Sequence, residues 1–353
     1  MVKALHRHGL KLTRHAAASL RTQICRLAGP ACERFGFFVL AADGSRFELP
    51  RTASHHRVFG AAGKPGSGPQ LWCTMLWQMS LGLPCHWRIG RARASERHHL
   101  RDMLDETPAH SLLVMDAGFT GYGLLRAIVD SGRDVLVRAS KRVELLTQLG
   151  YAQRVDDQTV YLWPSYAQRQ HQPPLVLRLI RLPGAGDRRR KVYLLTSVRD
   201  PQRLSDEQAG VLYRLRWGVE LGYHSLKQTL ERRKLRSHGA SQALFEMHGM
   251  LLGLMLLGWM SVHGIVSRGG DPLSWSLASA LRIVRRGLRE PSGGECWLAR
   301  LADAVKDGYR RVSKVRVDWP RKKQADPPPG RPELRRARRQ ERVLAQQLQE
   351  VAN

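Results

Sequence analysis

Four residues whose types suit phosphate chemistry lie in one stretch of the chain. Tyr213, Glu220 and Lys227 are spaced seven residues apart (220 − 213 and 227 − 220), so on a helix they drift only about 20° per step and share one face. Arg216 lies about 60° from that row. A ring, a guanidinium, a carboxylate and an ammonium do not make a core stripe. The alternative is a solvated face on which Arg216 pairs with Glu220.

Two aspartates end apolar runs. Asp43 follows Phe37–Ala42 and precedes Gly44, which predicts a strand that stops at a turn, and Asp116 follows a second apolar run from Ser111. Together with Glu220 they could hold two divalent cations about 4 Å apart, which activate the attacking oxygen and stabilise the leaving one in phosphoryl transfer. Mg²⁺ suits such oxygen ligands. Taken singly, Asp43 could instead be a turn residue and Asp116 a helix cap.

The composition favours a polyanionic partner. The 353 residues include 58 Lys+Arg and 30 Asp+Glu, a formal net charge of +28, and nucleic acid is the commonest partner of such an excess, ahead of an anionic membrane surface. The 42% hydrophobic residues are enough for a sizeable core, which excludes a wholly disordered basic protein. Five cysteines without a C-x-x-C pair indicate free thiols in a reducing compartment.

Strand and helix patterns alternate along the chain. Apolar runs at 37–42, 111–116 and 135–138 predict strands, and 119–131 has helical spacing, which is the rhythm of an α/β core. Residues 140–199 carry β-branched runs broken by Pro and Gly, which predicts a mostly β insertion.

Two helices are predicted in the second half of the chain. Ser205 and Gln208 have the form of a capping box, so a long helix should begin there and continue through Lys227. The apolar run Met247–Ile265 has the length of a membrane span, but it contains two histidines and four glycines. We interpret it as a buried core helix, with the membrane span as the alternative, and predict no membrane partner.

Both ends of the chain are basic. Six Lys+Arg and no acidic residue precede Glu33, and 301–353 contains 14 Lys+Arg against 7 Asp+Glu, with clusters at 321–323 and 335–339. Asp326–Gly330 is a Pro-rich breaker, which predicts an extended or fraying tail beyond it. The first predicted domain is a basic extension at 1–33, which could be a truncated DNA-binding region. The core is predicted in two parts, 34–139 and 201–270, with a β-rich insertion at 140–200 between them. A basic C-terminal region with a partly disordered tail is predicted at 271–353.

The four-residue pattern resembles a known signature. Tyr213, Arg216, Glu220 and Lys227 match, without a gap, the Y-x2-R-x3-E-x6-K signature of the DDE transposases of bacterial insertion sequences, in the insertion-sequence-four-like branch. Asp43, in Asp-Gly-Ser, resembles the first catalytic aspartate of that family. Asp116 resembles the second, although the next residue is alanine where the family usually has arginine. The resemblance covers roughly residues 37–266.

The resemblance implies a fold and a function. The fold would be α/β, with an RNase H-like catalytic core interrupted by a mostly β insertion and basic extensions at both ends. The function would be cut-and-paste DNA transposition, in which Asp43, Asp116 and Glu220 hold two Mg²⁺ or Mn²⁺ ions, water hydrolyses a phosphodiester at the element end, and the freed 3′-OH attacks target DNA. Double-stranded DNA and a second copy of the chain would be the partners, in the bacterial cytoplasm at the nucleoid.

Further residues would contact the DNA. Tyr213, Arg216 and Lys227 would bind phosphates near the cleaved end, because Arg grips phosphate in a fork and Lys as a point charge. Trp217 and Trp163 are candidates to stack on an unpaired base, and a core role is the alternative for each.

Other functions remain open from the sequence. An RNase H-like endonuclease would hydrolyse DNA without joining a 3′-OH to a target. An inactive or truncated transposon-derived DNA-binding protein is the rival from another class, because little of the chain precedes Asp43 and Met1 could lie inside a longer ancestral frame.

Overall fold

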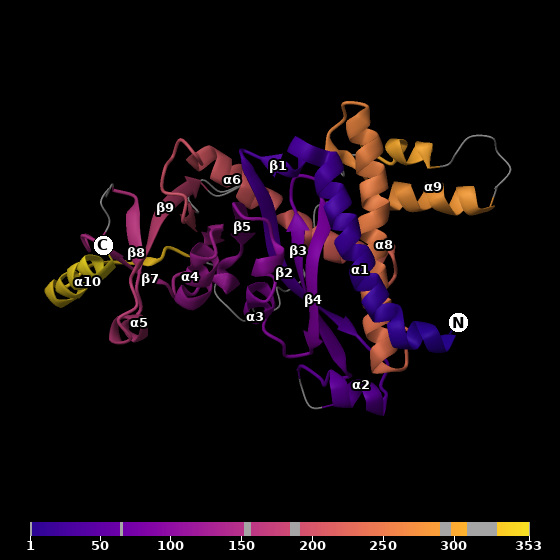
Figure 1. Cartoon of the computed structure of the whole chain (residues 1–353), viewed down its shortest axis with the longest axis horizontal. Helices are drawn as coiled ribbons and strands as arrows, with labels where there is room; N and C mark the ends of the chain where they lie inside the picture. The colour runs from indigo at the N-terminus through magenta and orange to yellow at the C-terminus, as the bar shows by residue number, and fades with distance from the viewer. Residues whose placement is uncertain are drawn as a thin grey trace, which may run out of the picture.

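One mixed sheet runs through the molecule, with helices on its faces (Figure 1). The computed structural model describes residues 2–63, 66–151, 157–183, 191–289, 298–308 and 330–352. Among them 11 strands join in the order β11-β7-β8-β9-β10-β6-β5-β2-β3-β4, with β1 paired to β2. The strands are β1 (Glu33–Arg34), β2 (Phe37–Glu48), β3 (Gln70–Gln78), β4 (Leu83–Arg91), β5 (Ser111–Met115), β6 (Asp134–Arg138), β7 (Glu144–Thr147), β8 (Thr159–Leu162), β9 (Leu175–Pro183), β10 (Lys191–Thr196) and β11 (Glu333–Arg336).

The helices cover both faces of this sheet. They are α1 (Val2–Ala28), α2 (Ala53–Val58), α3 (Glu96–Arg101), α4 (Tyr122–Asp130), α5 (Ser165–Arg169), α6 (Asp206–Leu215), α7 (Trp217–His224), α8 (Ala240–Ser267), α9 (Leu277–Arg289) and α10 (Arg339–Ala352). Side chains alternate between the two faces. Val39 and Ala41 of β2 belong to one buried cluster, and Leu40 and Ala42 belong to the other.

Five strands form the mixed core sheet of the chain. The strand order is β4-β3-β2-β5-β6, in which β3 is antiparallel to both β4 and β2, and β5 and β6 run parallel to β2. The apolar runs at 37–42, 111–116 and 135–138 are these central strands, and the helix expected at 119–131 is α4. The predicted α/β class is confirmed.

The predicted turn at Asp43 is wrong. Strand β2 continues to Glu48, and Asp43 and Gly44 pair with Met75 and Thr74 of β3. Glycine is required here by packing, because a Cβ on Gly44 would lie 2.4 Å from the ring of Trp72. The Asp43-Gly44 pair therefore lies inside a strand, where the glycine allows close contact with the Trp72 ring.

The β-rich segment joins the same sheet. Strands β9 and β10 form an antiparallel pair, and β10 also pairs with β6 of the core. Strand β8 pairs antiparallel with β9, and β7 with β8. Residues 140–200 thus extend the core sheet sideways, which brings the start of α6 back to the core.

The chain after the Pro-rich breaker is not an extended tail, which corrects the prediction. Strand β11 pairs in parallel with β7, and α10 follows it, with Ala345 fully buried. Arg335 holds this end in place through ion pairs to Glu144 at 2.8 Å and Glu341 at 2.7 Å. The basic cluster at 321–323 and most of the breaker lie outside the described residues.

The helix after Ser205 begins as predicted but is not continuous. Ser205 and Gln208 form the capping box. The helix tightens at Arg216, where the N–H of Val219 donates to the Arg216 carbonyl three residues earlier. After α7 comes a π-helical turn, Ser225–Thr229. A wider turn changes the angle between successive residues. The regular 100° per residue of an α-helix therefore does not give the position of Lys227 relative to Tyr213 and Glu220.

The long apolar helix α8 lies against α1 along the edge of the core (Figure 1). It is the one helix in the described ranges that is long and apolar enough to cross a membrane, and 44% of its most apolar window is buried. Met247, Leu251, Met255 and Val262 belong to the main buried cluster. One side of α8 is therefore part of the core.

A glycine substitution tests how α7 is seated. A Cβ on Gly222 would lie 2.6 Å from the buried ring of Trp77, whereas one on Gly253 of α8 meets nothing within 4 Å. We expect Gly222→Ala to lower the free energy of unfolding by about 1–3 kcal/mol through overpacking. The control Gly253→Ala should raise it by about 0.5–1 kcal/mol, because alanine is the better helix former. Urea unfolding measures both, and equal gains in the two variants would contradict this packing.

Candidate active site

Asp43 lies in the middle of β2 beneath α7. Its Oδ1 accepts a hydrogen bond from the N–H of Gly44 at 2.8 Å. The hydroxyl of Tyr223, on α7, donates to the carbonyl oxygens of Asp43 at 3.0 Å and of Cys73 at 2.8 Å. Burial, together with the charges of Glu220 and Asp116, raises the pKa of the Asp43 carboxyl to about 6 against the opposing effect of the Gly44 hydrogen bond.

Asp116 follows β5, next to Asp43 in the sheet. Its side chain caps the short 3₁₀ turn Ala117–Phe119, with Oδ1 accepting from the N–H of Gly118 at 2.8 Å. Strands β2 and β5 are parallel neighbours, and Ala41 pairs with Val114. The capping role considered for Asp116 is therefore observed, and within the described residues no hydrogen bond engages its second carboxylate oxygen.

Glu220 comes from α7 and is paired with Arg216. Arg216 Nη2 lies 3.0 Å from Glu220 Oε1, and the guanidinium carbon lies 5.6 Å from the centre of the Tyr213 ring. Although burial opposes it, the fields of Tyr213 and Glu220 raise the pKa of Arg216. Arg216 is only 9% exposed, so this row is a partly buried cluster and not the solvated face considered as the alternative.

The other candidate side chains lie in different surroundings. Lys227 Nζ donates to Ser45 Oγ at 2.6 Å, and it lies 5.1 Å from the centre of the Phe47 ring. Burial lowers the pKa of Lys227. Trp217 is 57% exposed. Trp163 is buried, and its Nε1 donates to the Gln172 carbonyl at 2.7 Å, so of its two predicted roles the core role is correct.

A fourth carboxylate, Glu96, was missed by the sequence prediction. It opens α3, and a Cβ built on Gly118 would lie 2.9 Å from Asp116 Oδ1 and 3.5 Å from Glu96 Oε1. The two carboxylates therefore flank the same backbone position. Burial raises the pKa of Glu96 to about 7, with further contributions from Asp116 and Asp43. Within the described ranges Glu96 forms no ion pair.

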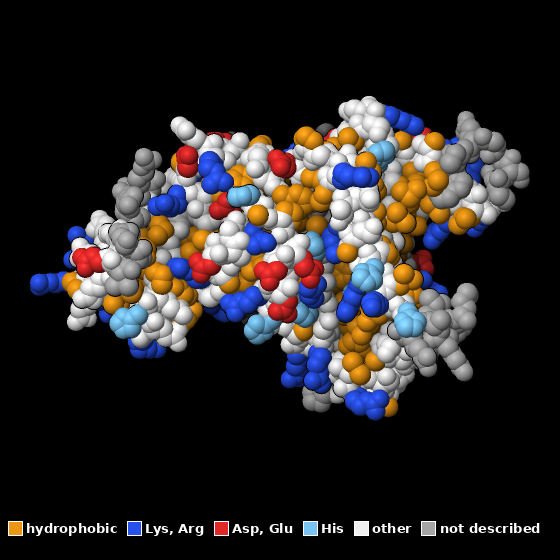
Figure 2. All heavy atoms as spheres, viewed as in Figure 1, with side chains coloured by type: hydrophobic (Ala, Val, Ile, Leu, Met, Phe, Trp, Pro, Cys, Tyr) orange, Lys and Arg blue, Asp and Glu red, His pale blue; other side chains and the backbone are white. Residues whose placement is uncertain are grey.

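No sequence signal singled out Glu96. A Ser-Glu pair at a helix start is ordinary capping chemistry, and the surrounding residues are charged as well. Figure 2 shows a small group of acidic side chains over the region of α3, on a face that otherwise carries many Lys and Arg. That local excess of negative charge in a chain of +28 is visible only in the folded structure.

The carboxylates of Asp43, Asp116, Glu220 and Glu96 are close enough to influence one another's charge, but their oxygens do not converge on a single point. Among the described residues, no group of three or more His, Cys, Asp or Glu is arranged to hold a metal as it stands. The nature of the donors nonetheless fits a hard divalent cation, because oxygen ligands with uncompensated negative charge are what Mg²⁺ and Mn²⁺ prefer.

Comparison with known proteins shows the family of this chain. A family model described as the transposase DDE domain matches residues 39–256, which is 218 of 353 residues (256 − 39 + 1). The chain belongs to the DDE transposase family. The matched span contains Asp43, Asp116 and Glu220. Family membership makes this DDE transposase an enzyme of DNA transposition and implies dependence on a divalent metal ion.

Two individual proteins are similar to this chain over part of their length. Transposase InsG for insertion sequence element IS4 of Escherichia coli (strain K12) is 27% identical over 307 residues, which is 83% of this chain and 68% of InsG. The cryo-EM structure of the piggyBac transposase synaptic complex with hairpin DNA is 13% identical, with a TM-score of 0.42, over 78% of this chain and 59% of that one. This transposase therefore spans less than two thirds of that structure's chain, and a likeness at that level carries no argument about mechanism.

The stability of the metal-free DDE transposase should depend on pH. The folded state holds protons on Asp43 and Glu96 up to a pKa of about 6 and about 7, whereas unfolded carboxyls release theirs near pH 4. At these two groups the folded state therefore binds more protons, so the stability that they contribute in EDTA should be lost as the pH rises from about 4 to 7. The difference in melting temperature between Asp43→Asn and the unmodified protein should therefore shift in favour of the variant as the pH rises over that range, and a difference that does not change with pH would contradict this assignment.

Proposed function

We propose that this DDE transposase performs cut-and-paste transposition. It would hydrolyse a phosphodiester at each element end and then join the freed 3′-OH to target DNA. The observation that carries the proposal is that Asp116 and Glu220, from two other elements, both lie within electrostatic reach of Asp43, and that all three residues are inside the family match.

The proposed ligand set is Asp43, Asp116 and Glu220, with two Mg²⁺ or Mn²⁺ ions. When bound, such ions lower the pKa of an attacking water and stabilise the leaving oxygen. Glu220 would exchange its bond to Arg216 for the cation, and the guanidinium would then be released toward a phosphate oxygen. The raised pKa of Asp43 supports this, because a carboxyl disfavoured as an anion gains most from a nearby cation.

Residues around the carboxylates would hold the DNA. Arg216 would grip one phosphate in a fork, with Tyr213 stacked against it, and Lys227 would contact another from the side of Ser45. Trp217 is exposed next to Arg216 and would stack on an unpaired base. Double-stranded DNA is the proposed substrate, as element end and as target. Pairing of two ends predicts at least a dimer.

The first experiment asks whether Glu220 is essential for cleavage. The purified protein is incubated with linear DNA carrying the flanks of its own gene, in Mg²⁺ or Mn²⁺. We expect end cleavage and joined products, both reduced more than about 100-fold in Glu220→Gln because an amide is a poor metal ligand. DNA binding should be nearly unchanged in a mobility-shift assay. The exposed Glu333→Gln, which removes the same charge from β11, is the control.

Each outcome selects one function. Cleavage without joining would favour the endonuclease, and binding without either product would favour the inactive DNA-binding protein. Normal cleavage by Glu220→Gln would remove Glu220 from the site.

A second experiment tests Glu96 by metal binding. Because its carboxylate faces Asp116 and has no ion-pair partner in the described ranges, we expect Glu96→Gln to weaken Mn²⁺ binding by about 10–100-fold. Electron paramagnetic resonance of free Mn²⁺ measures this without any turnover. The exposed Asp105→Asn is the matched control and should bind Mn²⁺ normally. Equal Mn²⁺ affinity in both variants would place Glu96 outside the metal site.

A further inference from the structure

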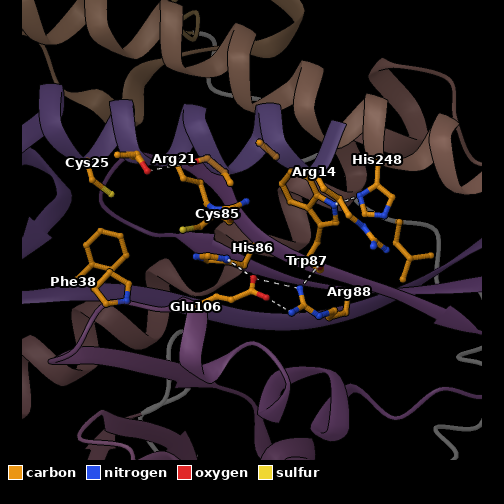
Figure 3. Close-up of a pocket in the computed structure, with 15 residues that line it drawn as sticks. Arg14, Arg21, Cys25, Phe38, Cys85, His86, Trp87, Arg88, Glu106 and His248 are labelled. Carbon is orange, nitrogen blue, oxygen red and sulfur yellow. Dashed lines mark hydrogen bonds and ion pairs between the residues drawn. The ribbon is translucent and has the colours of Figure 1, made fainter. Parts of the chain in front are cut away.

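A cavity lies away from the carboxylates, between α1 and the edge strand β4 (Figure 3). Its volume is about 880 Å³, and His248 of α8 also lines it. Arg88 of β4 pairs with Thr74, which in turn pairs with Gly44 beside Asp43. The cavity backbone is thus two strand spacings, about 10 Å, from the proposed active site across the sheet.

Positive charge in this cavity exceeds negative charge. Arg14, Arg21 and Arg88 line it, and among the described residues Glu106 is its one lining carboxylate. Glu106 is already engaged, because it pairs with Arg88 and lies 3.2 Å from His86 Nδ1.

Arg14 and Arg21 therefore have no carboxylate partner among the residues that the structure describes. Arg14 makes no hydrogen bond or ion pair there, and the hydrogen bond of Arg21 to the Cys85 carbonyl is long, at 3.4 Å. Burial lowers the pKa of Arg21, but a guanidinium remains charged at neutral pH. A partly buried cation such as Arg21, without a counter-ion, is a costly arrangement unless an anion completes it.

On the face of α1 that lines the cavity, a small residue separates the two arginines. Arg14, Ala18, Arg21 and Cys25 recur at helical spacing along the cavity. The two guanidinium side chains start about 10 Å apart along the helix axis, and the small side chain of Ala18 lies between them. Figure 3 shows both arginines extending from α1 toward β4.

Part of the cavity lining, away from the Arg88–Glu106 pair, carries no charge. Trp87 Nε1 donates to His248 Nδ1 at 2.9 Å, and both side chains are buried. Burial, with Arg14 and Arg88 nearby, lowers the pKa of His248 to about 4, so this imidazole is neutral at pH 7. Phe38 and Ile89 add apolar surface. A planar group of low polarity could therefore lie on this wall while an anionic group meets the arginines.

We propose that this cavity binds a nucleotide unit, with Arg14 and Arg21 contacting its phosphate. Guanidinium forks match phosphate oxygens, and the apolar wall suits a sugar and base. The nucleotide is either free or part of a DNA strand, and the chemistry is the same for both. The proposal does not rest on catalysis at the carboxylates.

Binding is measured in EDTA, so that no result depends on the proposed metal site. The probes are thymidine monophosphate, a labelled single-stranded oligonucleotide, a duplex of the same sequence, and inorganic phosphate as competitor. We expect the double variant Arg14→Gln, Arg21→Gln to bind the preferred probe at least about 10-fold more weakly. The double variant Lys11→Gln, Arg26→Gln removes the same charge from α1 outside the cavity, and we expect a change below about two-fold.

A second pair of variants leaves both arginines in place. Ala18→Glu places a carboxylate inside the cavity, and Ala16→Glu makes the same change at an exposed position of α1 outside it. Only the first should weaken binding. Tight binding of the monophosphate would identify a free nucleotide, and binding of oligonucleotides alone would identify a DNA strand. Equal losses in cavity and control variants, or no binding of any probe, would overturn the proposal.

Discussion

The seating of α7 on the sheet is the contact on which the candidate site depends. Gly222 lets the ring of Trp77 pack directly against the helix, and the Tyr223 hydroxyl joins it to the carbonyls of Asp43 and Cys73. These contacts fix one turn of helix over two adjacent strands. Glu220, less than one turn before Tyr223, is thereby brought near Asp43. The geometry of the candidate site is thus set by a glycine, a tryptophan and a tyrosine, none of which would itself take part in the proposed chemistry.

That packing has an electrostatic cost. Asp43 and Glu96 are partly buried and face further carboxylates, which is why their pKa values are raised. A fold selected for stability alone would not keep such groups together, because each gains more from water than from its neighbours. Arg216 offsets part of the cost by pairing with Glu220. The remaining repulsion is the physical argument for a cation at this place, independent of any family resemblance.

The sequence predicted the parts that depend on local pattern. The central strands follow from apolar runs, and the capping box at Ser205 marks a helix start because its hydrogen bonds are local. The local sequence pattern could not show that β2 continues through Asp43. The glycine that follows Asp43 is needed for contact with the ring of Trp72, which lies across the sheet. Glu96 could not be predicted from the sequence either. Its role depends on neighbours that are distant in sequence, and nothing in its own helix distinguishes it from an ordinary first-turn acid.

The charges of the whole molecule and of the site have opposite signs, and this constrains the order of events. A net charge of +28 attracts DNA from a distance. The carboxylate cluster repels a phosphate at short range, where screening is weakest. A scissile phosphate could therefore approach Asp43 and Asp116 closely only after a cation has reversed the local field. On the proposed function, metal binding would then precede productive docking of the DNA end, while the basic surface would hold the DNA in either state.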